Sequence, residues 1–279
     1  TALDVTSGNM DLGIQRARDM LQSSVALEIV DASVGNGTLE TRIRLSNKSG
    51  HKTPTSFPSR RMWLHLKVTD SNNQVVFESG RINPDGSIEG ADNDSDQTRF
   101  EPHYDLITSA DQVQIYEPVM GDSDGAITYT LLRAASYLKD NRLTPKGFDK
   151  ASVPEKVAVW GQAGNDDNFN LGSDEITYRV PVEASGQLTV EISLNYQTIM
   201  HGFIQDLYRN SELPEVQAFK TMYQAQSLKH ETITSTLAVL DNDDGNPPVA
   251  APSVAISAAP NSIEAGQSAL LSWSSTHAD

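Results

Sequence analysis

ITYRVPV at residues 176–182 and LTVEISLNY at residues 188–196 carry the clearest structural pattern in the chain. In both stretches apolar side chains alternate with polar ones. Successive side chains of a β-strand point to opposite faces, so this period of two predicts strands with one buried face. The Ser185-Gly186 step between them is typical of a tight turn and predicts that the two strands pair as a hairpin.

The same alternation occurs nearer the N-terminus, at residues 39–45 and 62–68. Shorter apolar runs that also favour strands lie at Val75–Phe77, Val113–Tyr116, Ile127–Leu132 and Val157–Trp160. Short strands joined by polar turns and loops are typical of antiparallel sandwiches. The predicted fold class is therefore mainly β, an antiparallel sandwich of Ig-like or jelly-roll-like type.

Two segments have helical spacing instead. Apolar residues recur at helical intervals in Asp11–Ser24, which predicts a short N-terminal helix. A second pattern, Val216, Phe219 and Tyr223, follows Pro214, which is tolerated in a first helical turn. It predicts a helical insertion before a closing strand at Thr232–Leu240.

These patterns divide the chain into an N-terminal helical segment (1–24), a β-sandwich domain (25–240), a polar linker (241–252) and a C-terminal piece (253–279). The apolar runs in this last piece, which includes Leu270-Leu271-Ser272-Trp273, resemble the first two strands of a bacterial immunoglobulin-like repeat. The piece is far shorter than the roughly 100 residues of a complete sandwich. We therefore expect a truncated Ig-like domain that continues towards the C-terminus. Thr1 is not an initiator methionine, so we also expect a processed chain or a piece of a longer protein.

The composition argues against several function classes. A net charge of −16 disfavours nucleic acid as a partner, because binding to phosphates needs a basic face. The chain has no cysteine, so it holds no disulfide, thiolate metal site or covalently attached haem. No apolar run approaches the roughly 18 residues needed to span a membrane. Phosphate-loop, nucleophile-elbow and zinc-protease motifs are also missing, so we expect a protein that is not an enzyme.

The segment from Asn47 to Val68 contains the most varied chemistry. It holds Gly50-His51, two prolines, and Arg60 and Arg61 before a strand. His51 could ligate a metal ion, and the arginines could bind a carboxylate. The alternative is structural: His51 bonds to loop backbone, and the arginines pair with acids inside this acidic chain.

Several motifs occur together in a fixed order between Asn9 and Tyr196. They are Gly50-His51-x-x-Pro54-Thr55, Arg60-Arg61-x-Trp63-Leu64, Glu78-Ser79-Gly80, Glu101-Pro102-His103-Tyr104, Gln114-Ile115-Tyr116-Glu117, residues 137–148 and Asp166-Asp167-x-Phe169.

In this order the motifs resemble the region that follows the haem-attachment sites in large bacterial multihaem c-type cytochromes. The resemblance implies a haem-free accessory or scaffold domain of a secreted, periplasmic or cell-surface cytochrome involved in extracellular electron transfer. It also implies a haem-bearing domain or chain as the partner, with His51, Arg60 and Arg61 as candidate contacts to its haem.

Acidic loops support a second interpretation. Asp166, Asp167, Asn168 and Asp174 offer oxygen ligands within one loop, and oxygen is the ligand that calcium prefers. These residues are the candidate calcium site. The alternative function is accordingly a calcium-stabilised extracellular adhesion or carbohydrate-binding module.

Overall fold

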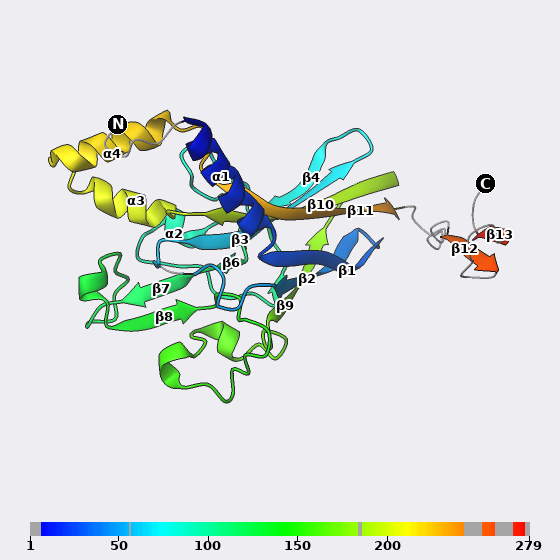
Figure 1. Cartoon of the computed structure of the whole chain (residues 1–279), viewed down its shortest axis with the longest axis horizontal. Coiled ribbons are helices and arrows are strands. Elements are labelled where there is room, and N and C mark those ends of the chain that lie inside the picture. The colour runs from blue at the N-terminus through cyan, green and yellow to red at the C-terminus, as the bar shows by residue number, and fades with distance from the viewer. Residues whose placement is uncertain (1–6, 56, 184–185, 243–252, 260–269, 277–279) are drawn as a thin grey trace. The chain divides into compact units, whose positions relative to one another are not determined.

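The computed structural model describes residues 7–55, 57–183, 186–242, 253–259 and 270–276. The chain divides into two units, residues 1–242 and 243–279. Within the described part of the first unit, strands dominate and a few helices accompany them (Figure 1). The predicted mainly β, sandwich-type fold is confirmed.

The first sheet has the strand order β1-β2-β9-β5. Its strands are β1 (Val25–Gly35), β2 (Thr38–Asn47), β9 (Ser173–Pro181) and β5 (Leu106–Ile107). Strands β1, β2 and β9 pair antiparallel, whereas the short β5 is parallel to β9. The β1–β2 hairpin turns at Asn36 and Gly37, whose φ angles of 52° and 71° are those that Asn-Gly turns accept.

The second sheet has the strand order β11-β10-β3-β4, and β6 also pairs with β3. Its strands are β3 (Arg61–Asp70), β4 (Val75–Ser79), β6 (Ile115–Tyr116), β10 (Gly186–Gln197) and β11 (Glu231–Asn242). All pair antiparallel, and β10 runs in unbroken register along β3 from Leu188 to Gln197. A separate two-stranded sheet consists of β7 (Pro118–Gly121) and β8 (Ser136–Asp140).

The predicted pairing of residues 176–182 with residues 188–196 is wrong. Strand β9 pairs with β2 and β5 in the first sheet, and β10 pairs with β3 and β11 in the second. The chain between them therefore crosses from one sheet to the other. Alternation buries one face of a strand equally well in either arrangement, so the pattern alone does not distinguish a hairpin from a crossing between sheets.

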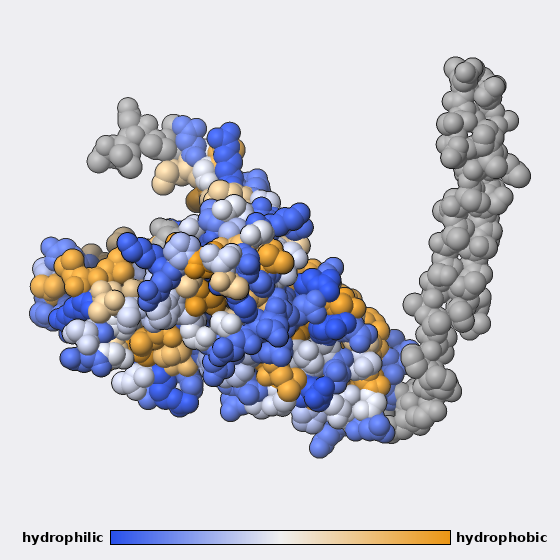
Figure 2. Space-filling view, turned by 90° about the horizontal axis from the view of Figure 1, so that it is seen from below, coloured by the Kyte–Doolittle hydropathy of each residue, from blue (hydrophilic) through white to orange (hydrophobic). Residues whose placement is uncertain are grey.

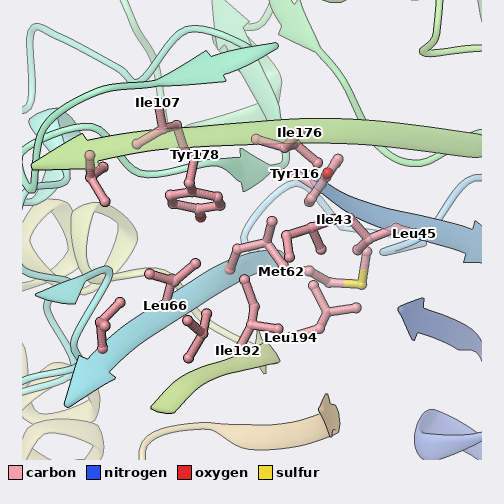
Figure 3. Close-up of a cluster of buried hydrophobic side chains, with 14 of the residues drawn as sticks. Ile43, Leu45, Met62, Leu66, Ile107, Tyr116, Ile176, Tyr178, Ile192 and Leu194 are labelled. Atoms are coloured by element: carbon pink, nitrogen blue, oxygen red, sulfur yellow. The ribbon is translucent and has the colours of Figure 1, made fainter. Parts of the chain in front are cut away.

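Alternating residues of the two sheets meet in one core (Figure 3). Ile43 and Ile176 from the first sheet and Leu66 and Ile192 from the second are fully buried there. Burial of this apolar surface is the main force that holds the two sheets together.

The two predicted helices form, as α1 (Ser7–Gln22) and α4 (Pro214–Ala225), and the structure adds α2 (Asp92–Ser95) and α3 (His201–Tyr208), which the sequence did not predict. Helix α1 precedes β1 and contacts β11. Helices α3 and α4 form the insertion between β10 and β11, and the one-turn α2 contacts α3. No helix of the described residues is long and apolar enough to cross a membrane.

Two predicted strands do not form. Residues 127–132 make only one isolated bridge, at Ile127, and then enter a 3₁₀ turn at Leu131–Arg133. Val157 ends another 3₁₀ turn, Glu155–Val157, and Trp160 makes an isolated bridge to Asp140. Residues 157–160 do not alternate, and residues 127–131 alternate but are half-buried or exposed, so neither run buries a continuous face. A third 3₁₀ turn lies at Gln162–Gly164.

Residues 241 and 242, assigned to the linker from sequence, belong to β11, and the rest of the linker lies outside the described residues. In the second unit, β12 (Ser253–Ala259) and β13 (Leu270–Thr276) pair antiparallel. The Ig-like character of this unit stays a prediction.

The face of the molecule drawn in Figure 2 is mostly hydrophilic with separate apolar patches, in keeping with the acidic composition.

Candidate functional site

The loop that carries His51 connects β2 of the first sheet to β3 of the second, and it is anchored at both ends. The Asn47 side-chain amide donates to the carbonyl oxygens of His51 (2.8 Å), Leu143 (2.9 Å) and Thr144 (3.1 Å). Thr53 and Leu143 exchange two backbone hydrogen bonds, each 2.9 Å long. The Thr53–Pro54 peptide bond between these anchors and the next strand is cis. The backbone around His51 is thus held against residues 143 and 144.

His51 itself is solvent-exposed, and the loop defines its tautomer. Its Nδ1 lies 3.0 Å from the carbonyl oxygen of Lys52. A carbonyl oxygen only accepts hydrogen bonds, so in the neutral imidazole Nδ1 carries the proton and Nε2 keeps its lone pair. This arrangement, with Nδ1 donating to a backbone carbonyl, is the one that histidine commonly adopts when Nε2 binds a metal ion.

His51 lines a cleft of about 690 Å³, which is within the range of small-molecule and cofactor pockets. Helix α1 forms an apolar wall of the cleft with Ile14, Ala17, Met20 and Leu21. The remaining lining comes from the His51 loop, the end of β10 and the start of β11. The cleft therefore combines a neutral imidazole with an apolar wall.

The cleft also gathers basic side chains in an acidic protein. Arg18 of α1 forms a hydrogen-bonded ion pair with Glu231 of β11, with distances of 2.7 and 2.9 Å, and both residues line the cleft. Lys48 and Arg60 line it as well, and neither forms an ion pair within the described residues. Two positive charges are thus available to an anionic group in the cleft.

Arg61 has a different role from its neighbour Arg60. Its guanidinium is fully buried and forms a bidentate ion pair with Asp94, at 2.8 and 2.7 Å. Its Nε also donates to Gln197, 2.8 Å away. Arg61 does not line the cleft. Of the three predicted haem contacts, the structure therefore brings His51 and Arg60 together and turns Arg61 inward, where it pairs with an internal acid.

A second group of polar side chains lies inside the protein, around His103. The Nε2 of His103 is 3.1 Å from Oδ2 of Asp166 and 3.7 Å from Oδ1 of Asp174. Tyr116 of β6 donates to the other oxygen of Asp174 at 2.6 Å, and Phe169 packs edge-on against the imidazole. A histidine and two carboxylates in such proximity form a candidate metal centre.

The hydrogen bonds to the other ring nitrogen test this candidate. Nδ1 of His103 faces the amide groups of Gln114 (2.8 Å) and Asn141 (3.1 Å). The backbone orients both amides, because Oε1 of Gln114 accepts from the N–H of Tyr104 and Nδ2 of Asn141 donates to the carbonyl of Ile115. Two N–H donors thus point at Nδ1, which must be the acceptor.

The ring proton of His103 is therefore on Nε2, from which it is donated to Asp166. A metal ion binds an unprotonated nitrogen, so Nε2 is not a free ligand in this arrangement. The donor set fits a hydrogen-bonded cluster between loops rather than a transition-metal site. Sequence reasoning missed His103 in this role, although it recognised the Glu101-Pro102-His103-Tyr104 motif.

The four predicted calcium ligands do not converge on one point. Asp166 and Asp174 face His103, whereas Asp167 is exposed. Asn168 anchors its loop to β9, because its Oδ1 accepts a hydrogen bond of 2.7 Å from the N–H of Glu175. Calcium binding here stays a prediction.

Burial dominates the electrostatics of the cluster. It raises the pKa of Asp174 to about 6, because the carboxylate is shielded from water, while His103 and Tyr116 partly offset the effect. Oδ1 of Asp174 has no hydrogen-bond partner among the described residues. Burial also opposes ionisation of Asp166, but hydrogen bonds from His103 and a backbone N–H outweigh it and lower the pKa of that residue.

No family model matches the chain, and a search of curated proteins finds no match. Among solved structures, the chain is similar to a penta-haem cytochrome c552 from Thermochromatium tepidum, with 14% sequence identity and a TM-score of 0.48. The likeness covers 80% of this chain and 41% of the cytochrome, so the chain spans less than half of that protein's length. A likeness at this level assigns neither a family nor a function.

Proposed function

We propose that the β-sandwich unit is a haem-free accessory domain of a multihaem c-type cytochrome, and that the cleft under α1 is where a haem-bearing domain or chain docks. One observation carries the proposal: the imidazole of His51, whose Nδ1 contacts the loop backbone, lines a cleft that also contains Lys48 and Arg60. The ordered motifs around His51 support the same role. The proposed function is binding and scaffolding in extracellular electron transfer, without catalysis, at a secreted, periplasmic or cell-surface location.

Each part of the cleft suits one part of an exposed haem. A neutral imidazole with a free Nε2 is a common axial ligand of haem iron. The apolar side chains of α1 would contact the macrocycle, and Arg60 and Lys48 would bind carboxylates such as propionates. The haem itself would come from the partner, because this chain has no cysteine to attach one.

A haem peptide that carries one axial histidine and an open sixth position tests the proposal. Titration with the wild-type chain should convert the peptide to the low-spin absorption spectrum of bis-histidine ligation. His51→Gln should abolish this conversion. His65→Gln is the matched control, because His65 lies on β3, contacts Glu78 and is not in the cleft. No conversion with the wild type, or equal conversion with His51→Gln, would overturn the proposal.

A further inference from the structure

We infer that Asp140 is a positioning residue for His51: through Lys52, its carboxylate fixes the carbonyl that selects the ligand-competent tautomer of the imidazole. The inference rests on the proposed function of the cleft and identifies a residue outside the cleft that controls it. The two residues that connect the chain of contacts, Asp140 and Lys52, are far apart in sequence and meet only in the fold.

Asp140 is a fixed anchor. It ends β8, its side chain is only 2% exposed, and its backbone forms a bridge to Trp160. Arg142 binds both of its carboxylate oxygens, with distances of 2.7 and 2.8 Å. Two hydrogen bonds from one guanidinium leave the carboxylate little freedom to rotate.

Lys52 joins this anchor to the His51 loop. Its ammonium donates to Oδ2 of Asp140 at 2.7 Å and to the carbonyl of Ala158 at 2.8 Å, and it lies 5.6 Å from the centre of the Phe148 ring. The carbonyl of the same Lys52 accepts the hydrogen bond from Nδ1 of His51. The Lys52 side chain therefore restrains the residue whose carbonyl accepts from His51, while the hydrogen bond from the Thr53 N–H to Leu143 holds the other side of the same peptide group.

The loop does not need this contact merely to stay attached. Asn47 and the Thr53–Leu143 backbone pair already hold the segment on both sides of Lys52. A lysine that extends into the protein between these anchors and is held there by Asp140 and the carbonyl of Ala158 adds a constraint at the residue next to His51. That constraint acts on His51 because Lys52 supplies its hydrogen-bond acceptor.

The test uses Lys52→Met as the main variant. It keeps the aliphatic stem and removes the ammonium, while Asp140 stays paired with Arg142, so the fold should persist. We expect about a tenfold loss of affinity for the haem peptide, the lower end of what changes to groups that orient metal ligands cause. Asp140→Asn should cause a similar loss. The double variant should be no weaker than Asp140→Asn alone, because both single variants remove the contact between Lys52 and Asp140. Asp124→Asn, which changes an exposed carboxylate outside both sites, should have no effect.

A second readout does not depend on haem. Nitrogen-15 NMR of the imidazole should show mainly the Nδ1–H tautomer of His51 in the wild type and a mixture of tautomers in Lys52→Met. Unchanged tautomer populations in a folded Lys52→Met would overturn the inference, as would unchanged haem-peptide affinity. If the wild type never binds the peptide but the tautomer shift occurs, the proposed function fails while the positioning role stands.

Discussion

Tyr116 donates a hydrogen bond of 2.6 Å to Asp174, and both side chains are fully buried. The carboxylate is thereby hydrogen-bonded on one oxygen only, since its other oxygen has no hydrogen-bond partner among the described residues. Burial of a half-satisfied carboxylate costs free energy whenever it is ionised. Burial of Asp174, which the hydrogen bond from Tyr116 only partly offsets, therefore makes the stability of the sandwich depend on pH.

Asp174→Asn should stabilise the protein at pH 7. In the folded protein the pKa of Asp174 is about 6, above the ordinary value of 3.8, so the folded state holds the proton more tightly than the unfolded state. This group then lowers the free energy of unfolding as the pH rises from about 4 to 6, by on the order of 3 kcal/mol in total. Urea unfolding at several pH values should show the variant gaining stability over the wild type across that window. A difference that does not change with pH would contradict the assignment.

The same substitution should affect different properties at the neighbouring residues Arg60 and Arg61: haem-peptide binding at Arg60 and stability at Arg61. Arg61→Gln leaves Asp94 buried without its partner and should lower the free energy of unfolding by about 3–5 kcal/mol. Arg60→Gln should leave thermal stability nearly unchanged, because Arg60 forms no ion pair within the described residues, but should weaken haem-peptide binding several-fold. Thermal melts and titrations of both variants check the contrast, and equal loss of stability in the two would refute it.

For β9 and β10, the sequence predicts the strands themselves but not the strands with which they pair. Their alternation identified both strands, because a half-buried strand has the same period whatever it pairs with. Their partners depend on contacts with β2 and β3, more than a hundred residues away in sequence, and on the crossing between sheets. No local pattern encodes that choice.

Only the part of the cleft that comes from one short stretch of sequence was predictable. His51 and Arg60 are close together in one motif and could be recognised as a site. The apolar wall of α1 and the ion pair between Arg18 and Glu231 come from opposite ends of the sandwich unit, so only the fold brings them to His51. The inward direction of Arg61 followed from its position as the first residue of β3, which the sequence did not define.

The calcium prediction for Asp166, Asp167, Asn168 and Asp174 has a direct test. Calcium that binds only the folded protein must raise its Tm. Asp166, Asn168 and Asp174 already form hydrogen bonds that calcium would have to replace. These bonds therefore argue against a calcium-dependent rise in Tm. We therefore expect the same Tm in millimolar calcium, in magnesium and after treatment with a chelator. A rise specific to calcium that Asp166→Asn removes would establish the site instead.

Helix α1 allows a matched test of the docking surface. Ile14 and Leu12 are both 49% exposed, but only Ile14 lines the cleft. Residues two positions apart in a helix are rotated by about 200° around the helix axis, so these two side chains point to nearly opposite sides. Ile14→Gln should weaken binding of the haem peptide about fivefold, roughly the effect of losing half of a buried apolar side chain. Leu12→Gln should have no effect on binding, and both variants should melt at similar temperatures because both side chains are half exposed. Equal loss of binding in the two variants would mean that the cleft face of α1 is not the docking surface.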